Sequence, residues 1–232
     1  MDNVNIRIIA RMHSDFPSKF GIPRQSGLVD SLRSTIIFEP EFRNADALRG
    51  MDGFSHLWLI WQFSEAVRSE WSPTVRPPRL GGNTRLGVFA TRSPFRPNSL
   101  GLSCVKFLGV EQTKEYGPVI HVAGADLMND TPIFDIKPYI PYSDCKANAT
   151  GGFTDSADSF LLKVDFPESL LNILPENKRE AAIDVLSHDP RPSYQRDPQR
   201  IYGLPFANYD IRFQVREDIL TVTEVNPYNN DR

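Results

Sequence analysis

The sequence predicts a mainly β protein, with a β-barrel domain over residues 1–160 followed by a small α+β domain over residues 161–232. Three observations support this fold class. Short apolar runs rich in Val, Ile, Leu and aromatic residues recur up to about residue 163, and many of the 19 prolines and 14 glycines separate them. The only helical hint in this part is short. Many strands with almost no helix are typical of a barrel or a sandwich.

The strands expected in the first domain are apolar runs bounded by turn residues, namely residues 6–11, 34–39, 56–63, 86–91, 102–109 and 119–123. The short helix is expected at residues 44–49, where Asn44 is a suitable N-cap. The small, polar residues 151–159 indicate the end of this domain.

The second domain begins a different pattern. Residues 175–186 predict a helix, since a proline precedes its start, acidic residues come early and an apolar face follows. Residues 209–215 and 219–225 then alternate as the two strands of a hairpin around Arg216-Glu217-Asp218.

Composition excludes several classes of protein. With 26 Lys and Arg against 29 Asp and Glu, the net charge of −3 excludes a general polyanion binder. The two cysteines and four histidines are far apart, so neither a disulfide framework nor a metal site is expected. No apolar run approaches the roughly 20 residues that span a bilayer. A soluble, cytoplasmic protein is therefore expected, and because G-x-G and phosphate-loop motifs are absent, it uses no common nucleotide-binding fold.

Positive charge is concentrated in one stretch. No acidic residue occurs between Glu70 and Glu111, whereas six basic residues do. They are Arg76, Arg79, Arg85, Arg92, Arg96 and Lys106. Arginine suits bidentate recognition of phosphate or carboxylate, so the stretch favours a rigid anion-binding surface. The alternative is a set of solvated loop charges that pair with acidic residues elsewhere in the fold.

Three polar segments are the candidates for a functional site. Residues 91–102 form a loop stiffened by two X-Pro steps, and residues 19–25 pair an arginine and an amide with a proline-fixed backbone. Residues 125–139 hold three carboxylates within strand-like sequence, Asp126, Asp130 and Asp135. Such carboxylates can accept a proton, although acids that merely cap a turn would look the same.

Read together, these segments resemble the TsaA/TrmO-like (YaeB-type) family of S-adenosylmethionine-dependent tRNA N6-adenosine methyltransferases. The resemblance covers roughly residues 5–150. It rests on Phe20-Gly21-Ile22-Pro23-Arg24-Gln25, Leu48-Arg49-Gly50, Gly53-Phe54-Ser55-His56-Leu57-Trp58, Val75-Arg76-Pro77-Pro78-Arg79-Leu80-Gly81-Gly82, Gly87-Val88-Phe89-Ala90-Thr91-Arg92-Ser93-Pro94-Phe95-Arg96-Pro97-Asn98 and Asp126-Leu127 through Asp135-Ile136-Lys137-Pro138-Tyr139.

The resemblance implies a homodimer of β-barrels that binds S-adenosylmethionine. The residues implied in cofactor binding are Pro23, Arg24, Gln25, Ser64, Glu65, Arg92, Leu102, Thr131, Pro132, Ile133 and Phe134. One departure is that Phe63-Ser64 stands where family members often have Phe-His. The implied substrate is the adenosine at position 37 of tRNA, next to the anticodon, already carrying threonylcarbamoyl on N6.

Methyl transfer needs positioning rather than a covalent nucleophile or a metal. A carboxylate that accepts the N6–H would activate this poor nucleophile, and Asp126, Asp130 and Asp135 are equal candidates. The residues expected to bind RNA are Arg76, Arg79, Arg85, Arg96 and Lys137, with Phe95, Phe134, Tyr139 and Tyr142 as possible stacking groups. Two rival interpretations remain: a non-catalytic RNA-binding module that uses the arginine-rich loop, and a small-molecule hydrolase that uses the three carboxylates.

Overall fold

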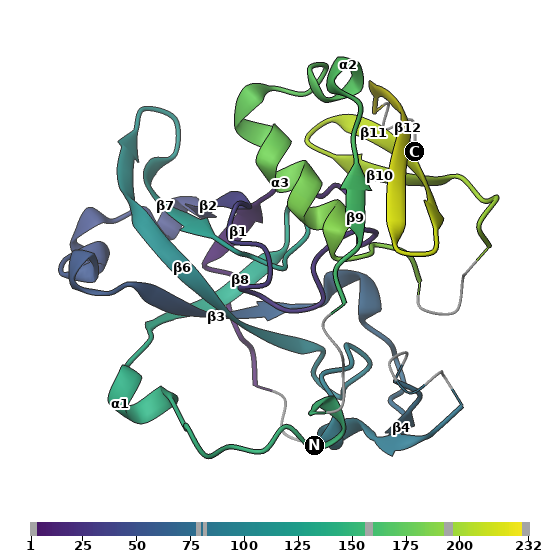
Figure 1. The fold of residues 1–232 in the computed structure, drawn as a ribbon. Helices are drawn as coiled ribbons and strands as arrows, with labels where there is room; N and C mark the ends of the chain where they lie inside the picture. Colours follow the sequence, from purple (N-terminus) through teal and green to yellow (C-terminus); the bar gives the residue numbers. More distant parts are fainter. Residues whose placement is uncertain (1–3, 78–79, 81–82, 156–159, 193–196, 229–232) are drawn as a thin grey trace.

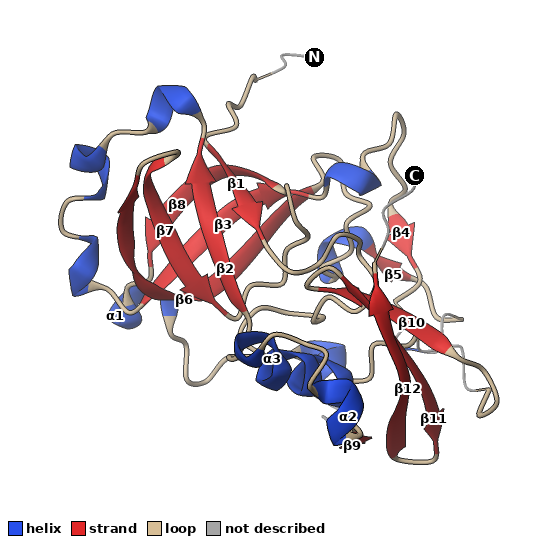
Figure 2. Ribbon diagram, turned by 90° about the horizontal axis from the view of Figure 1, so that it is seen from above, coloured by secondary structure: helices blue, strands red, loops and turns tan. Residues whose placement is uncertain are grey.

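The computed structural model describes residues 4–77, 80, 83–155, 160–192 and 197–228, and it contains a closed sheet and a separate C-terminal sheet (Figure 1). The closed sheet has the strand order β1-β2-β7-β6-β3-β8. Its strands are β1 (Ala10–His13), β2 (Arg33–Phe38), β3 (His56–Gln62), β6 (Leu100–Thr113), β7 (Gly117–Ala123) and β8 (Pro132–Pro138). The first strand pairs with the last, so the sheet that was predicted to be a barrel closes on itself (Figure 2).

Alternating burial explains the closure. In β3, Leu57, Leu59 and Trp61 are buried, while the residues between them are partly exposed. These side chains enter one core with inward residues of the other strands, such as Ile36 of β2 and Val105 of β6. Because residues of one strand face alternate sides, every strand can bury one face inside the closed sheet.

Two predicted strands differ from the structure. The strand expected at residues 6–11 begins only at Ala10, and of residues 86–91 only Leu86–Gly87 (β5) is extended, pairing with β4 (Thr74–Val75). The next residues, Val88–Ala90, form a 3₁₀ helix. The carbonyl oxygen of Val88 accepts hydrogen bonds from Thr91 and from the Arg96 side chain instead of a neighbouring strand. The predicted N-cap is confirmed, since the Asn44 side chain accepts from the Asp46 amide.

The C-terminal sheet has the strand order β10-β11-β12-β9 and is covered by helices. Its elements are β9 (Lys163–Asp165), α2 (Glu168–Leu171), α3 (Glu176–Ser187), β10 (Tyr202–Phe206), β11 (Tyr209–Arg216) and β12 (Ile219–Pro227), and a short α1 (Pro141–Asp144) precedes them. The predicted helix and hairpin are confirmed. The sequence did not indicate β9, which has only three residues, or β10, which contains Pro205, a residue that is unusual inside strands. Among the described residues, no helix is both long and apolar enough to cross a membrane.

The loop between β1 and β2 belongs to the C-terminal core. Phe16, Val29 and Leu32 are buried among residues of α3 and of the C-terminal sheet, and Phe20 and Ile22 pack against the same core. The domain boundary at residue 160 stays a prediction. A cut there would separate this loop from the residues on which it packs.

Candidate functional site

A cavity of about 800 Å³ lies where β3 ends and β6 begins. Three segments that the sequence singled out surround it: residues 19–25, residues 91–102 and the start of residues 125–139. Of the residues that the family resemblance implies in cofactor binding, eight line the cavity: Pro23, Arg24, Gln25, Ser64, Glu65, Arg92, Leu102 and Thr131. Asp126 lines it too.

Hydrogen bonds made by the next two residues, Ser26 and Gly27, hold the Pro23–Gln25 segment in place. The Ser26 hydroxyl accepts a hydrogen bond from the Cys104 amide of β6 over 3.1 Å, and the Gly27 amide donates to the Gly124 carbonyl over 2.8 Å. Gly124 has a φ of +71°, and a Cβ there would lie 3.2 Å from the Gly27 Cα. The close approach therefore requires glycine, and it places Gln25 and Asp126 on the same cavity.

Arg92 and Gln25 join the two sides of the cavity. A guanidinium N–H of Arg92 donates to Gln25 Oε1, while Gln25 Nε2 donates to the Arg24 carbonyl over 2.5 Å. Both ends of the Gln25 amide are thus engaged. The remaining N–H groups of Arg92 lie at the cavity, where they can hold a carboxylate.

The arginine-rich loop is braced by one of its own arginines. Arg96 Nη1 donates to the Val88 carbonyl over 3.2 Å and to the Thr91 carbonyl over 2.7 Å. The sequence assigned Arg96 to RNA, but these bonds give its guanidinium a part in holding the loop. The loop ends at Ser99, whose carbonyl accepts a hydrogen bond from the Phe63 amide.

A chain of hydrogen bonds leads from the core to the carboxylate of Asp126. Trp61 Nε1 donates to Ser103 Oγ over 2.9 Å, and Ser103 Oγ donates to Asp126 Oδ1 over 2.5 Å. Gly101 makes room for this arrangement, because a Cβ there would lie 2.3 Å from Trp61 Cε2. The next residue, Leu102, lines the cavity and is 56% exposed, so it offers an apolar surface there.

Burial raises the pKa of Asp126 above its ordinary value of 3.8. The hydrogen bond from Ser103, backbone amides and the charge of Arg92 oppose this effect. The carboxylate is thus poised closer to neutrality than an ordinary surface aspartate, and it is a better proton acceptor when ionised.

Other predicted residues lie elsewhere. Pro132 and Ile133 are buried in β8, Ile133 in the core of the closed sheet, and Phe134 is half-buried there; none of the three lines the cavity as the described residues form it. Asp130 is exposed and contacts Arg11, and Asp135 pairs with Lys137 over 2.9 Å. Of these three carboxylates, only Asp126 lines the cavity, which counts against a hydrolase that uses the three together.

The other arginines that were predicted to bind RNA lie outside the cavity lining or outside the described residues. Arg76 and Arg85 are exposed next to β4 and β5, where they are free to meet a large ligand. Arg79 lies outside the described residues. Among the expected stacking groups, Phe95 lines the cavity, whereas Tyr139 packs against Trp58, with the ring centroids 5.8 Å apart.

Several lining residues were not predicted. They are Lys19, Trp61, Phe63, Arg68 and Met128, together with Ile22, Gln62, Ala66, Val67, Thr91, Pro94, Leu100 and Gly101. One signal was available for Trp61 and Gly101. A glycine inside a strand often marks a close approach of another group, although the sequence does not say which group.

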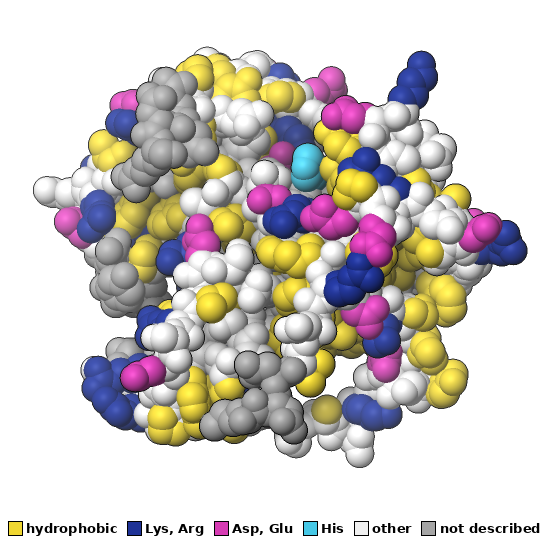
Figure 3. Space-filling model, turned by 180° about the vertical axis from the view of Figure 1, so that it is seen from behind, with side chains coloured by type: hydrophobic (Ala, Val, Ile, Leu, Met, Phe, Trp, Pro, Cys, Tyr) yellow, Lys and Arg dark blue, Asp and Glu magenta, His cyan; other side chains and the backbone are white. Residues whose placement is uncertain are grey.

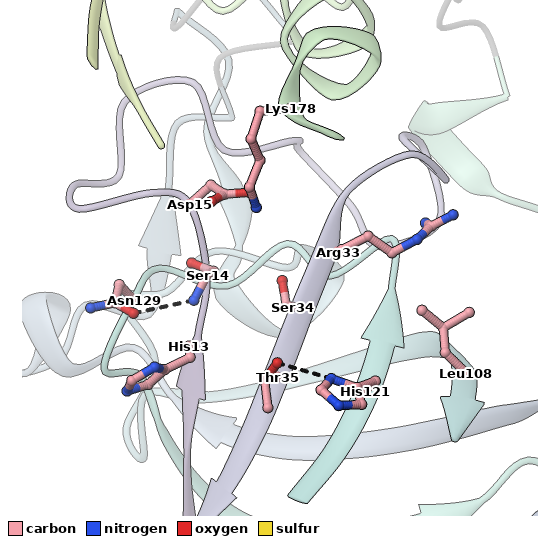
Figure 4. Close-up of a pocket in the computed structure, with 10 residues that line it drawn as sticks. All are labelled: His13, Ser14, Asp15, Arg33, Ser34, Thr35, Leu108, His121, Asn129 and Lys178. Atoms are coloured by element: carbon pink, nitrogen blue, oxygen red, sulfur yellow. Dashed lines mark hydrogen bonds and ion pairs between the residues drawn. The ribbon is translucent and has the colours of Figure 1, made fainter. Parts of the chain in front are cut away.

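A second cavity of about 400 Å³ lies between the closed sheet and α3 (Figure 4). In it, His121 Nδ1 is hydrogen-bonded to Thr35 Oγ1, Asn129 accepts from the Ser14 amide, and Lys178 of α3 pairs with Asp15 over 2.6 Å. These polar groups pair with one another rather than facing an open space. In the part of the chain that the structure describes, no three His, Cys, Asp or Glu side chains come together as they would to hold a metal ion.

The geometry defines a class of protein. It is a closed β sheet with an attached α+β unit, and its large cavity joins a guanidinium, a partly buried carboxylate and an apolar wall. Family models give the family: the tRNA-methyltransferase O N-terminal domain matches residues 11–145, and the TrmO C-terminal domain matches residues 160–228. The chain belongs to the tRNA-methyltransferase O (TrmO) family.

Individual relatives agree. The tRNA (adenine(37)-N6)-methyltransferase of Escherichia coli (strain K12) is 35% identical over 98% of this chain and 100% of its own. RcsF of Pseudomonas aeruginosa is 37% identical over 94% of this chain and 95% of its own, and its name contains the words S-adenosylmethionine-dependent methyltransferase. A crystal structure of TrmO from P. aeruginosa superposes with a TM-score of 0.80 at 32% identity, covering 98% of each chain.

Proposed function

We propose that this chain is an S-adenosylmethionine-dependent methyltransferase that acts on N6 of adenosine 37 in tRNA carrying threonylcarbamoyl at that nitrogen. The observation that supports it most is the convergence of Arg92, Asp126 and Leu102 on one cavity. The names of the relatives from E. coli and P. aeruginosa support the same reaction and the same methyl donor.

The groups around the cavity fit S-adenosylmethionine. Its carboxylate suits Arg92, which Gln25 orients, and its cationic centres suit the carboxylates of Asp126 and Glu65. Its flat adenine suits the apolar side chains of Leu102 and Phe63. Ligand cavities are generally about 300–1,000 Å³. The cavity of about 800 Å³ therefore has room for this group and for part of a substrate.

Asp126 is the residue that activates the substrate nitrogen in this proposal. When bound, S-adenosylmethionine supplies an electrophilic methyl group on a positively charged sulfur. The lone pair of N6 is delocalised into the adenine and its acyl substituent, so this nitrogen is a poor nucleophile. The Asp126 carboxylate accepts the N6–H, which raises the electron density on the nitrogen as it attacks. Arg92 and the rigid loop around Arg96 hold the reacting groups in line, and such positioning lowers the barrier to transfer.

The positive charge of the cavity supports a substrate adenosine that carries a threonylcarbamoyl group. Among the described residues that line it, five are basic and two are acidic. The basic residues are Lys19, Arg24, Arg68, Arg92 and Arg96. One guanidinium suffices for the carboxylate of the methyl donor, so a second anion has partners left. The threonine carboxylate of the modified adenosine is such an anion.

The proposal includes a homodimer in the cytoplasm. Both cysteines, Cys104 and Cys145, are free thiols, which agrees with a reducing compartment. The dimer rests on the resemblance to the family, and sedimentation of the purified chain tests it.

The test of function is a comparison of two tRNA samples that differ only in threonylcarbamoyl at adenosine 37. Each is incubated with the chain and S-adenosylmethionine, and its nucleosides are then analysed by mass spectrometry. The proposal expects one methyl group gained by the threonylcarbamoyl nucleoside and none by the unmodified adenosine. Equal methylation of both would leave only the broader activity, and no methylation of either would reject the proposal.

A further inference from the structure

Two aromatic side chains beside the cavity are exposed to solvent. Trp71 is 51% exposed and Phe89 is 71% exposed, and their ring centroids lie 6.1 Å apart with an angle of 33° between the planes. We call this pair the Trp71–Phe89 platform. Single exposed apolar residues are ordinary, so the feature to explain is that two large aromatic side chains are exposed next to each other.

Phe89 owes its exposure to a rigid turn rather than to a loose loop. Its neighbour Val88 is buried, and the Val88 amide donates to the Pro73 carbonyl over 2.9 Å. The Val88 carbonyl in turn accepts from Thr91 and Arg96. The backbone thus holds the aromatic side chain outward, and a ligand that stacks on it meets a preformed surface.

Arginines connect the platform to the cavity. The guanidinium carbon of Arg96, which lines the cavity, lies 5.7 Å from the centroid of the Phe89 ring. Arg68 lies 3.8 Å over Phe95, another residue of the cavity. Seen from behind, Lys and Arg side chains lie next to hydrophobic ones at the lower left of the molecule, with an acidic side chain among them, over the segment that contains β4 (Figure 3). The platform therefore continues the cavity into a positively charged, aromatic surface.

Such a surface suits a flat π system attached to negative charge. An unpaired nucleotide has both, since its base stacks on aromatic side chains and its phosphate pairs with arginine. A purely apolar peptide would offer no counter-charge to the exposed Arg76 and Arg85 beside β4 and β5. We infer that the Trp71–Phe89 platform stacks an unpaired base of the RNA substrate adjacent to the base that enters the cavity. This inference rests on the proposed function.

The test combines protein variants with RNA variants. Wild type, Phe89→Ala, Trp71→Ala and Phe89→Trp are titrated with an anticodon stem–loop, with S-adenosylhomocysteine present, and binding is followed by fluorescence anisotropy. The same titrations use stem–loops with an abasic site on either side of the target adenosine. Phe54→Ala is the matched control, because Phe54 is exposed at the opposite end of β3 from the cavity.

Each alanine variant is expected to bind the intact stem–loop about 5- to 100-fold more weakly, as loss of one stacked base implies. Phe89→Trp should retain the affinity, and Phe54→Ala should match the wild type. One abasic stem–loop should bind wild type and Phe89→Ala equally weakly, since the lost base and the lost ring belong to one contact. The inference would be overturned if the affinity losses from the alanine substitution and from the abasic site simply added for both abasic stem–loops. Full affinity of both alanine variants for the intact stem–loop would overturn it as well.

Two controls separate this inference from the proposed function. Calorimetry with S-adenosylmethionine should give the same affinity for wild type and Phe89→Ala, because neither Phe89 nor Trp71 lines the described cavity. If the wild type neither binds nor methylates the stem–loop, the proposed function fails. If it does both and the alanine variants equal it, only the platform is wrong. A further outcome is an alanine variant that binds RNA like the wild type but has a different particle mass in light scattering. That result would overturn the inference and assign the surface to contacts between copies of the chain.

Discussion

Ser103 Oγ donates a hydrogen bond to Asp126 Oδ1 over 2.5 Å, and the same oxygen accepts one from Trp61 Nε1. A hydroxyl has a single hydrogen, so the indole N–H commits that hydrogen to the carboxylate. The hydrogen bond stabilises the ionised form of Asp126 and lowers its pKa, whereas burial, the larger effect, raises it. Ser103 thus limits how far burial shifts the titration of Asp126.

Ser103→Ala should move the acid limb of the pH–rate profile to higher pH. In the proposed mechanism the ionised carboxylate is the active form, so the rate should fall as the pH drops through the raised pKa of Asp126. Removing the hydrogen bond raises that pKa further. Single-turnover methylation measured across the acid range checks the shift. Superimposable acid limbs in the two proteins would contradict a role for Asp126 as the proton acceptor.

Asp126→Asn should change how stability depends on pH. Because the pKa of Asp126 is higher in the folded chain than its ordinary value of 3.8, the folded state binds more protons at this group. Its contribution to stability is therefore complete at low pH and is lost as the pH rises through the raised pKa. Urea unfolding at several pH values should show that the free energy of unfolding declines less with rising pH in the asparagine variant than in the wild type. An unchanged pH slope would place the titration elsewhere.

Arg92→Ala should abolish methylation by weakening the binding of S-adenosylmethionine. The guanidinium loses its bond with Gln25 and its charge at the cavity. A hydrogen bond to a charged group contributes about 1.5–3 kcal/mol, so a roughly 10- to 100-fold rise in Kd is expected by calorimetry. Arg85→Ala is the matched control, because Arg85 lies outside the described cavity lining. Equal affinities for wild type and Arg92→Ala would remove Arg92 from the site.

Arg76→Ala and Arg85→Ala should weaken tRNA binding and make it less sensitive to salt. Both side chains are exposed, and each phosphate contact that is lost should reduce the slope of log K against log salt by about 0.7–0.9. Filter binding at several salt concentrations measures this slope. Arg49→Ala is the control, since Arg49 is equally exposed but lies before β3, at the end remote from the cavity. A slope identical to the wild type in both variants would count against a phosphate role.

The sequence predicted most of the fold because strand periodicity and turn residues act locally. The hairpin of β11 and β12 and the helix α3 are confirmed, since each is determined by residues close in the chain. The prediction that residues 86–91 form a strand was wrong, because a contact outside the segment decides its conformation. The side chain of Arg96 donates a hydrogen bond to the Val88 carbonyl of the 3₁₀ helix Val88–Ala90. The packing of the β1–β2 loop in the C-terminal core was also out of reach, because residues distant in sequence create it.

In the candidate site, too, local features could be predicted and contacts between distant residues could not. Pro23–Gln25, Arg92 and Asp126 occur in local motifs, so the sequence could name them. The hydrogen-bond chain that ends at Asp126 starts on two other strands, β3 and β6, and only their register brings Trp61 and Ser103 together. The charge of Arg96 was evident, but no count of charges tells whether a guanidinium meets a ligand or its own backbone.

Gly21 is one of the residues through which the loop that carries Pro23–Gln25 touches the C-terminal unit. Its φ is +84°, and a Cβ there would lie 2.0 Å from Leu204 Cδ1 of β10. Gly21→Ala should therefore both strain the backbone, at roughly 1–2 kcal/mol, and push the loop away from the C-terminal sheet. Because Pro23–Gln25 follow directly, cofactor affinity should fall together with stability.

A double-mutant cycle separates the two effects. Leu204→Ala alone should cost about 2–5 kcal/mol of unfolding free energy, because this fully buried side chain leaves a cavity. In the double variant Gly21→Ala/Leu204→Ala, the smaller side chain gives the new methyl group space, so the two losses should sum to more than the measured total. Cofactor affinity should recover partly as the loop returns. Strictly additive losses, with no recovery of affinity, would mean that the C-terminal sheet does not position the cofactor loop.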